Sequence, residues 1–237
     1  MKIDIIISAD DIQESKIKKK NVVVIDMLRA TTVIITAFMN GCKEVIPYLT
    51  IDEALNKSKT LKRDSYVLGG ERKAMKIEGF DLSNSPLEYT KDTVNNKTVI
   101  ITTTNGTRTL TECTEAKRIF VGAMINGKAV AEKLIELGDD VCIVNAGTNG
   151  EFSMDDFICS GYIINEILKL TNKVDLTDIA KTANYIYESN PSIESFIHSA
   201  RHYGVMKDLD LMEDIHYAMQ KDITKIVPEY KGGRILK

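Results

Sequence analysis

Short runs of β-branched residues with almost no polar alternation are the feature that most constrains how this chain can fold. In Val22–Ile25, Val99–Ile101 and Val141–Val144, every position is apolar. A strand with one face in water alternates between apolar and polar residues, so these runs indicate strands that are covered on both faces. The full set of predicted strands is Ile3–Ile7, Asn21–Ile25, Glu44–Tyr48, Ser65–Leu68, Lys97–Ile101, Arg118–Val121 and Val141–Asn145.

Amphipathic stretches of helical length separate these strands over the first two-thirds of the chain. They span Ala30–Met39, Asp52–Leu61, Thr107–Cys113 and Gly127–Leu137. Strands that alternate with helices are typical of α/β proteins, in which a helix connects one parallel strand to the next. The sequence therefore predicts a layered αβα fold around a mostly parallel or mixed sheet.

The last third of the chain has a different pattern, because no convincing strand follows Ser153. We expect residues 1–152 to form the α/β sheet region and residues 153–237 to form a helical region packed on it, within one compact unit. The tail from Glu229 to Lys237 is predicted to be mobile. The predicted helices are Ser153–Leu170, Leu176–Glu188, Ser192–His202 and Asp208–Gln220, with a break at Ser189-Asn190-Pro191.

Composition excludes several classes of protein. The chain is 43% hydrophobic with a net charge of −3, which is ordinary for a globular protein and too apolar for a disordered one. No run approaches the roughly 18 apolar residues of a membrane span, no signal-peptide pattern is present, and a slightly acidic chain is a poor candidate for binding nucleic acid. Four widely spaced cysteines indicate reduced, mostly buried thiols of a cytoplasmic protein. The apolar helical tail is compatible with a homodimer.

Three of the strongest strands run directly into short turns of small and polar residues. The turns begin after Asp26, Thr102 and Asn145, and ligands bind beyond the carboxyl ends of the strands in an open parallel sheet. Two turns contain Asn-Gly, where a positive φ would expose backbone N–H groups to an anion. The alternative is that the threonines only cap the helices that follow. The candidate binding residues are Arg29, Thr31, Thr104, Asn105, Gly106, Thr107, Arg108, Asn149 and Gly150.

Carboxylates accompany the same turns. Asp26 follows four apolar residues at the end of a strand and could bind Mg²⁺, activate water or attack phosphorus. Alternatively, Asp26 pairs with Arg29 or caps the next helix. Asp155 and Asp156 open a long helix after the third turn, where they are candidate metal ligands or general acid–base groups. Acids in a first helical turn also suit the helix dipole without any further role.

The long connection Gly69–Pro86 is a further candidate region, because such loops in compact domains are usually functional or disordered. Glu71 and Arg72 directly follow a strand and are its stronger candidates, whereas Asn84 and Ser85 add polar groups before the proline. The alternative is a surface loop with ordinary turn chemistry.

The histidines give a weak signal. His198 and His202 are four residues apart and would share one face of a helix. Two histidines without a third ligand make a poor metal site, so we favour a surface or packing role for both.

Five motifs occur in one order along the chain, and together they are more specific than any of them alone. They are Val24–Thr32, Gly70-Glu71-Arg72, Gly79–Pro86, Thr103–Arg108 and Ala146–Gly150. On these motifs the chain resembles the 2-phosphosulfolactate phosphatase family over residues 1–220. The resemblance implies Mg²⁺-dependent hydrolysis of (2R)-2-phospho-3-sulfolactate to 3-sulfolactate and phosphate, a step of coenzyme M biosynthesis in methanogens.

The resemblance also suggests roles for the candidate residues. Asp26, Glu71 and Asp155, with Asp156 as the alternative acid, would hold or orient Mg²⁺ and the attacking water. Arg29 and Arg108 would neutralise the phosphate, while Arg72 and the Asn105-Gly106 and Asn149-Gly150 turns would hold the carboxylate and the sulfonate. Two alternatives stay open: Asp26 as the acceptor of the phosphoryl group, and a non-catalytic binding module or sensor for a small phosphorylated or sulfonated metabolite.

Overall fold

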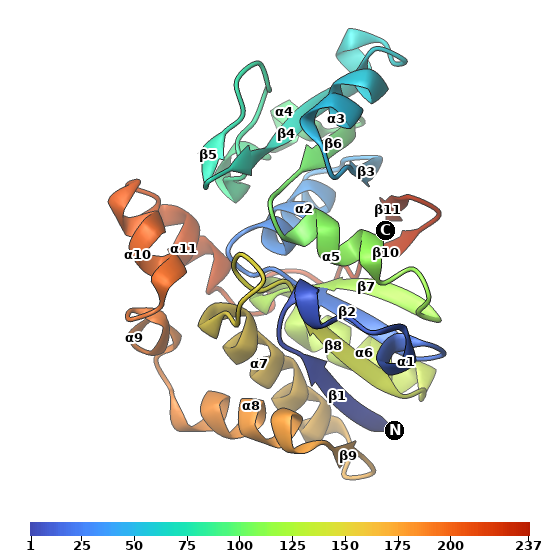
Figure 1. Ribbon diagram of the computed structural model, residues 1–237, viewed down its shortest axis with the longest axis vertical. Helices are drawn as coiled ribbons and strands as arrows, with labels where there is room; N and C mark the ends of the chain where they lie inside the picture. The colour runs from blue at the N-terminus through green and yellow to red at the C-terminus, as the bar shows by residue number, and fades with distance from the viewer.

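The computed structural model describes residues 1–237 and confirms the α/β architecture (Figure 1). Every residue of β2 (Asn21–Ile25), β6 (Thr98–Thr102) and β8 (Val141–Asn145) is buried, as expected for strands that are covered on both faces. The other strands are β1 (Lys2–Ile6), β3 (Glu44–Pro47), β4 (Tyr66–Arg72), β5 (Met75–Lys76), β7 (Arg118–Gly122), β9 (Asp175–Leu176), β10 (Glu229–Lys231) and β11 (Arg234–Leu236).

All strands join in one mixed sheet, in the order β5-β4-β6-β3-β11-β10-β7-β2-β8-β1-β9. Two groups within it are parallel: β4, β6 and β3 on one side, and β7, β2, β8, β1 and β9 on the other. The antiparallel hairpin of β10 and β11 lies between the two groups and joins β7 to β3. In Figure 1 this hairpin lies on the opposite side of the molecule from β5.

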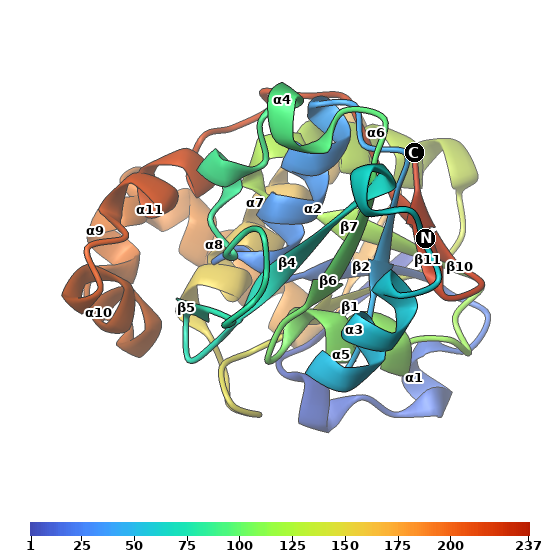
Figure 2. The same cartoon turned by 90° about the horizontal axis from the view of Figure 1, so that it is seen from above.

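Helices cover both faces of the strands. Along β6, Val99 and Ile101 pack in the same core as α2, whereas Ile100 between them packs in a separate core with α3. Figure 2 shows α2 and α3 on opposite sides of the central strands. The helices are α1 (Glu14–Ile17), α2 (Ala30–Met39), α3 (Ile51–Ser58), α4 (Lys91–Val94), α5 (Gly106–Glu112), α6 (Gly127–Leu137), α7 (Met154–Leu170), α8 (Asp178–Ser189), α9 (Ile193–Ile197), α10 (Arg201–Asp208) and α11 (Met212–Ala218).

The C-terminal tail differs from the expectation that it would be mobile. It forms β10 and β11 within the sheet, and the side chains of Tyr230 and Ile235 are buried. Both strands are three residues long, which is too short for an apolar run to show in the sequence. The turn between them is Gly232-Gly233, with φ values of 59° and 82°, and two-residue hairpin turns of this kind favour glycine.

The helical region is also divided differently from the prediction. The expected helix Ser192–His202 is two helices, because the backbone is extended at Ala200, with φ −69° and ψ 141°. A new helix, α10, begins at Arg201. His198 and His202 therefore lie in separate segments, and the prediction that they share one helix face is wrong.

All four cysteines are buried and free, as predicted. Burial raises the pKa of Cys42, Cys113 and Cys142 to about 12. These thiols therefore stay protonated at neutral pH. No helix combines the length and the apolar character that crossing a bilayer requires.

Candidate active site

A cavity of about 510 Å³ lies where the loops after β2, β4, β6 and β8 meet, and α10 lines it from the other side. The prediction that the three polar turns lie at the same edge of the sheet is therefore confirmed, because residues of all three line this cavity. In Figure 1 this region is the side of the molecule where β5 approaches α10. The predicted site residues that line the cavity are Asp26, Arg29, Glu71, Arg72, Asn84, Thr104, Asn105 and Asn149.

The turns after β2 and β6 touch each other, although four strands separate β2 from β6 in the sheet. A Cβ on Gly106 would lie 2.6 Å from both Asp26 Oδ2 and Ala30 Cβ, so the contact needs glycine. Gly106 begins α5 and does not have the positive φ predicted for an Asn-Gly turn. The other turn does have it, at Asn149 (54°) and Gly150 (77°).

Asp26 lies at the cavity wall and is only partly exposed. Its Oδ1 accepts a hydrogen bond from the backbone N–H of Ala30 at 3.2 Å, while Oδ2 has no donor. Burial raises the pKa of Asp26 to about 6, with smaller contributions in the same direction from Asp155 and Glu71; the Ala30 N–H and His202 act against it. The cavity thus contains a carboxylate with one oxygen free to bind a ligand.

Glu71 connects two turns of the cavity wall. Its Oε1 accepts the backbone N–H of Thr104 at 2.7 Å, and its Oε2 accepts the backbone N–H of Ala74 at 2.9 Å. The preceding Gly70 has a φ of 132°, and a Cβ there would lie 2.0 Å from the carbonyl oxygen of Thr102. The glycine lets β4 and β6 approach closely enough for Glu71 to span the two turns.

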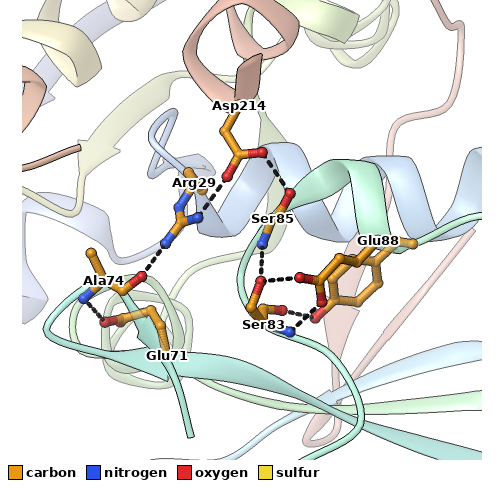
Figure 3. Close-up of polar contacts among 8 residues, drawn as sticks. Arg29, Glu71, Ala74, Ser83, Ser85, Glu88 and Asp214 are labelled. Atoms are coloured by element: carbon orange, nitrogen blue, oxygen red, sulfur yellow. Dashed lines mark hydrogen bonds and ion pairs between the residues drawn. The ribbon is translucent and has the colours of Figure 1, made fainter. Parts of the chain in front are cut away.

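Arg29 is held in a buried network that Figure 3 shows. Its Nη1 donates to Asp214 Oδ2 at 2.6 Å, and its Nη2 donates to the carbonyl oxygen of Ala74 at 2.7 Å. Ser85 Oγ donates to the other oxygen of Asp214 at 2.5 Å. The Arg29 and Asp214 side chains are only 2% and 4% exposed. Removing one partner of such a pair would leave a buried charge without compensation. Through this pair, Asp214 holds the Arg29 guanidinium in place and attaches α11 to the turn after β2.

The cations of the cavity differ in how far they are neutralised. Arg201 pairs with Glu151 at 2.6 Å, as Arg29 pairs with Asp214. Arg72 donates only to neutral groups, namely the carbonyl oxygens of Glu71 and Leu49 and the hydroxyl of Thr102. Lys73 lines the cavity and belongs to none of the ion pairs. Arg72 and Lys73 therefore supply positive charge that no carboxylate cancels.

Arg108 is a predicted binding residue that the structure places outside the cavity. It does not line the cavity, its side chain is 42% exposed, and it pairs with Asp10 and Glu112, each at 2.6 Å. The expectation that Arg108 faces the same anion as Arg29 has no support in this geometry. The physical reason is that α5 begins at Gly106, which directs Arg108 outward to the acids beside it.

Other predicted residues support the cavity from behind. Thr31 Oγ1 donates to the carbonyl oxygen of Asp26 at 2.9 Å and accepts the Asp26 N–H at 3.1 Å. Thr107 Oγ1 makes the same pair of bonds with Thr103, at 3.0 and 3.3 Å. Both threonines are buried and bind the backbone of the turn before their own helix. Neither is a helix cap, because the N-cap residues of α2 and α5 are Arg29 and Asn105. Neither Ser85 nor Gly150 lines the cavity.

Asp155 and Asp156 are each only 2% exposed and do not line the cavity. Asp156 accepts the backbone N–H groups of Met27 at 2.8 Å and Gly147 at 3.0 Å, so it joins the turns after β2 and β8. Asp155 accepts a hydrogen bond from the Ser153 hydroxyl. Burial, with Asp155 and Asp26 nearby, raises the pKa of Asp156 well above its usual range.

Several residues of the cavity were not predicted as site residues, and His202 was assigned a surface or packing role instead. His202 and Arg201 line it from the first turn of α10, and Asp214 supports it from α11. The helix break at Ala200, which turns α10 toward the cavity, has no proline or glycine to mark it in the sequence. Lys73 directly follows Glu71 and Arg72, which were predicted as site residues. Its position beside them was the one sequence signal that it could belong to the site.

Oxygen donors suited to a divalent cation are present in part. Asp26 Oδ2 is unpartnered, and the buried Asn84 Oδ1 at the same cavity accepts no hydrogen bond. No three acidic, histidine or cysteine side chains converge as a metal-binding group. Mg²⁺ is commonly held by only one or two carboxylates together with substrate phosphate and water. Asp26 is therefore the carboxylate of the cavity with an oxygen free for such a cation, whereas both oxygens of Glu71 already accept backbone N–H groups and Asp155 lies too deep to line the cavity.

Comparisons with known proteins agree on one family. A family model described as 2-phosphosulpholactate phosphatase matches residues 6–233. A protein of Clostridium beijerinckii named "Probable 2-phosphosulfolactate phosphatase" is 66% identical over 235 residues, which is 99% of each chain. Proteins with the same name from Clostridium botulinum (strain Eklund 17B) and Clostridium acetobutylicum are 59% and 58% identical, over 100% of each chain. The chain belongs to the 2-phosphosulfolactate phosphatase family.

Proposed function

We propose that this protein is a Mg²⁺-dependent phosphatase that hydrolyses 2-phospho-3-sulfolactate to 3-sulfolactate and phosphate. The observation that carries the proposal is the charge of the cavity, which is lined by Arg29, Arg72, Lys73 and Arg201 beside the carboxylates of Asp26 and Glu71. A site that only bound anions would gain nothing from two carboxylates, whereas a metal-dependent hydrolase needs them. The family membership supports the same reaction.

The substrate fits this arrangement in charge and in size. It carries a phosphate, a carboxylate and a sulfonate on three carbons, so several cations must lie close together to bind it. The cavity volume of about 510 Å³ is within the usual range for a small-molecule site, roughly 300–1,000 Å³. Arg29 and Arg72 present guanidinium groups whose positions are fixed by other contacts, which favours recognition of a defined anion geometry.

In the proposed mechanism, a water molecule attacks phosphorus, the bond between phosphorus and the ester oxygen breaks, and the leaving oxygen takes up a proton. Arg29 and Arg72 stabilise the negative charge on the phosphoryl oxygens. Asp26, and Glu71 through its remaining lone pairs, would hold Mg²⁺, which when bound neutralises phosphate charge. Thr31 and Asp156 keep the Asp26 turn in position through its backbone. His202 lines the same cavity, where it can exchange a proton with the bound ester.

The test is phosphate release from racemic phosphosulfolactate, with Mg²⁺ and with EDTA, for the wild type and Asp26→Asn. We expect EDTA to abolish turnover and Asp26→Asn to lower kcat by roughly 100-fold or more. Asp139→Asn is the control, because Asp139 pairs with Lys117 away from the cavity. Turnover unaffected by EDTA would refute the metal mechanism. No turnover, with 3-sulfolactate still raising the melting temperature, would indicate a binding protein.

The direct attack of water has its own test. Asp26 could instead accept the phosphoryl group, since its Oδ2 is unpartnered. Rapid-quench experiments with labelled substrate would then trap a phosphorylated Asp26. We expect no such species, and its detection at a kinetically competent rate would replace the water mechanism by a covalent one.

A further inference from the structure

The hairpin of β4 and β5 has an unusual tip. Lys73 and Ala74 form its two-residue turn, with φ values of 54° and 62°. L-residues with side chains rarely adopt this left-handed conformation, and such turns normally contain asparagine, aspartate or glycine. A tip that keeps lysine and alanine in this conformation must be held by the structure around it.

Two contacts hold the tip, and Figure 3 shows both. The N–H of Ala74 donates to Glu71 Oε2 at 2.9 Å, and its carbonyl oxygen accepts Arg29 Nη2 at 2.7 Å. Arg29 is itself fixed by the buried Asp214. Because both polar groups of the Ala74 backbone are anchored to the cavity wall, the position from which the Lys73 side chain extends is fixed as well.

Lys73 differs in chemistry from the other cations of the cavity. Arg29 and Arg201 are each paired with a carboxylate, and Arg72 is fixed by neutral acceptors. Lys73 is an exposed residue that lines the cavity, and its side chain forms no ion pair or hydrogen bond with the protein. A guanidinium is a planar fork that matches carboxylate and phosphate, whereas an ammonium is a point charge with three rotatable donors.

We propose that Lys73 is the residue by which the cavity recognises the sulfonate of its substrate, an inference that rests on the function proposed above. A sulfonate has three equivalent oxygens and a permanent negative charge. It therefore suits an ammonium that no carboxylate neutralises. The arginines are left for the phosphate and the carboxylate, and Lys73 sets the preference for a sulfonated ester over the same ester without sulfonate.

The experiment compares two substrates that differ only in this group, 2-phosphosulfolactate and 2-phospholactate. We expect Lys73→Met to lower kcat/KM for phosphosulfolactate by about 10- to 100-fold, the worth of one charge-assisted hydrogen bond. For phospholactate the change should stay within about 3-fold. Lys73→Arg should restore part of the preference. The control is Lys76→Met on the same hairpin, because the Lys76 ammonium donates to the carbonyl oxygen of Asp81 and does not line the cavity.

Folding and recognition can be separated with Lys73→Gly. Glycine tolerates the left-handed turn, so this variant should keep or raise the melting temperature while it loses the preference for the sulfonated ester. Equal losses on both esters would overturn the proposal, since Lys73 would then serve the phosphate or the carboxylate. Unchanged kinetics for both esters would overturn it too.

Failure of the proposed function gives a different result. In that case the wild type hydrolyses neither ester, and calorimetric titration with 3-sulfolactate and with lactate decides the role of Lys73. The proposal requires Lys73→Met to weaken binding of 3-sulfolactate about 10-fold or more, with no comparable change for lactate. Equal affinity of wild type and variant for 3-sulfolactate would refute it.

Discussion

Two arginines that were both predicted to bind the substrate have different positions in the folded chain. Arg72 donates to three neutral acceptors at the cavity, while Arg108 is exposed and paired with two acids outside it. The sequence alone predicts the same binding role for both arginines, because it shows how near each lies to a predicted strand and not where its side chain points. The direction depends on where the next helix begins and on which acids lie within reach.

The pair of arginines gives a direct test of the site. We expect Arg72→Met to lower kcat/KM for the phosphate ester by roughly 30-fold or more, because losing a charged partner in an enclosed site typically costs about 2–5 kcal/mol of binding. Arg108→Met should change kcat/KM by less than about 2-fold, because an exposed ion pair contributes little. Steady-state kinetics on both variants checks this. A larger effect for Arg108 than for Arg72 would mean that the substrate binds over α5, outside the cavity.

Supporting residues were harder to assign than cavity residues. Asp155 and Asp156 look like metal ligands in the sequence because they are adjacent acids near a polar turn. In the structure Asp156 instead satisfies two backbone N–H groups from different turns. Buried N–H groups need acceptors, and a sequence does not show which N–H groups will be buried. The same reason explains why Asp214, the partner of Arg29, was not recognised.

At the scale of elements, the strands that could be predicted most clearly from the sequence are those that are buried on both faces. The strands in the middle of each parallel group are continuous apolar runs and were located within a residue or two. The β10–β11 hairpin was not predicted, because strands of three residues are too short to show a periodic pattern. The Gly232-Gly233 pair was the one sequence signal of a hairpin turn. The break between α9 and α10 was not predicted because no proline or glycine marks it, although α9 ends at Ile197 and the backbone is extended at Ala200.

The hairpin can be tested by one pair of adjacent substitutions. Ile235 is fully buried between the two parallel groups, while its neighbour Leu236 is exposed. We expect Ile235→Ala to lower the free energy of unfolding by about 2–4 kcal/mol. Leu236→Ala should lower it by less than about 1 kcal/mol. Urea unfolding followed by circular dichroism measures both. Similar small losses for the two variants would show that the hairpin is not part of the folded core in solution.

At the scale of the whole molecule, the sheet region and the helical region share a core. Ile143 on β8 and Ile163 and Ile167 on α7 belong to one buried cluster. Asp214 on α11 is bonded to Arg29, which precedes α2. The cavity needs both regions, because its walls come from the strand loops and from α10. A boundary near residue 152 therefore marks a change in secondary structure, and we predict that it does not mark a unit that folds separately.

The cysteines provide the measurement for this prediction. Cys142 on β8 and Cys159 on α7 are both fully buried, and burial raises the pKa of each thiol, to about 12 for Cys142. Since only the thiolate reacts with an alkylating agent, neither should react at pH 8 in the folded protein. A pulse of iodoacetamide at increasing urea concentration, read by mass spectrometry of the peptides, reports when each becomes accessible. We expect the two to become reactive at the same urea midpoint, as for a single cooperative unit. Reaction of Cys159 at clearly lower urea than Cys142 would mean that the helical region opens first, and that the cavity loses its α10 wall while the sheet is still folded.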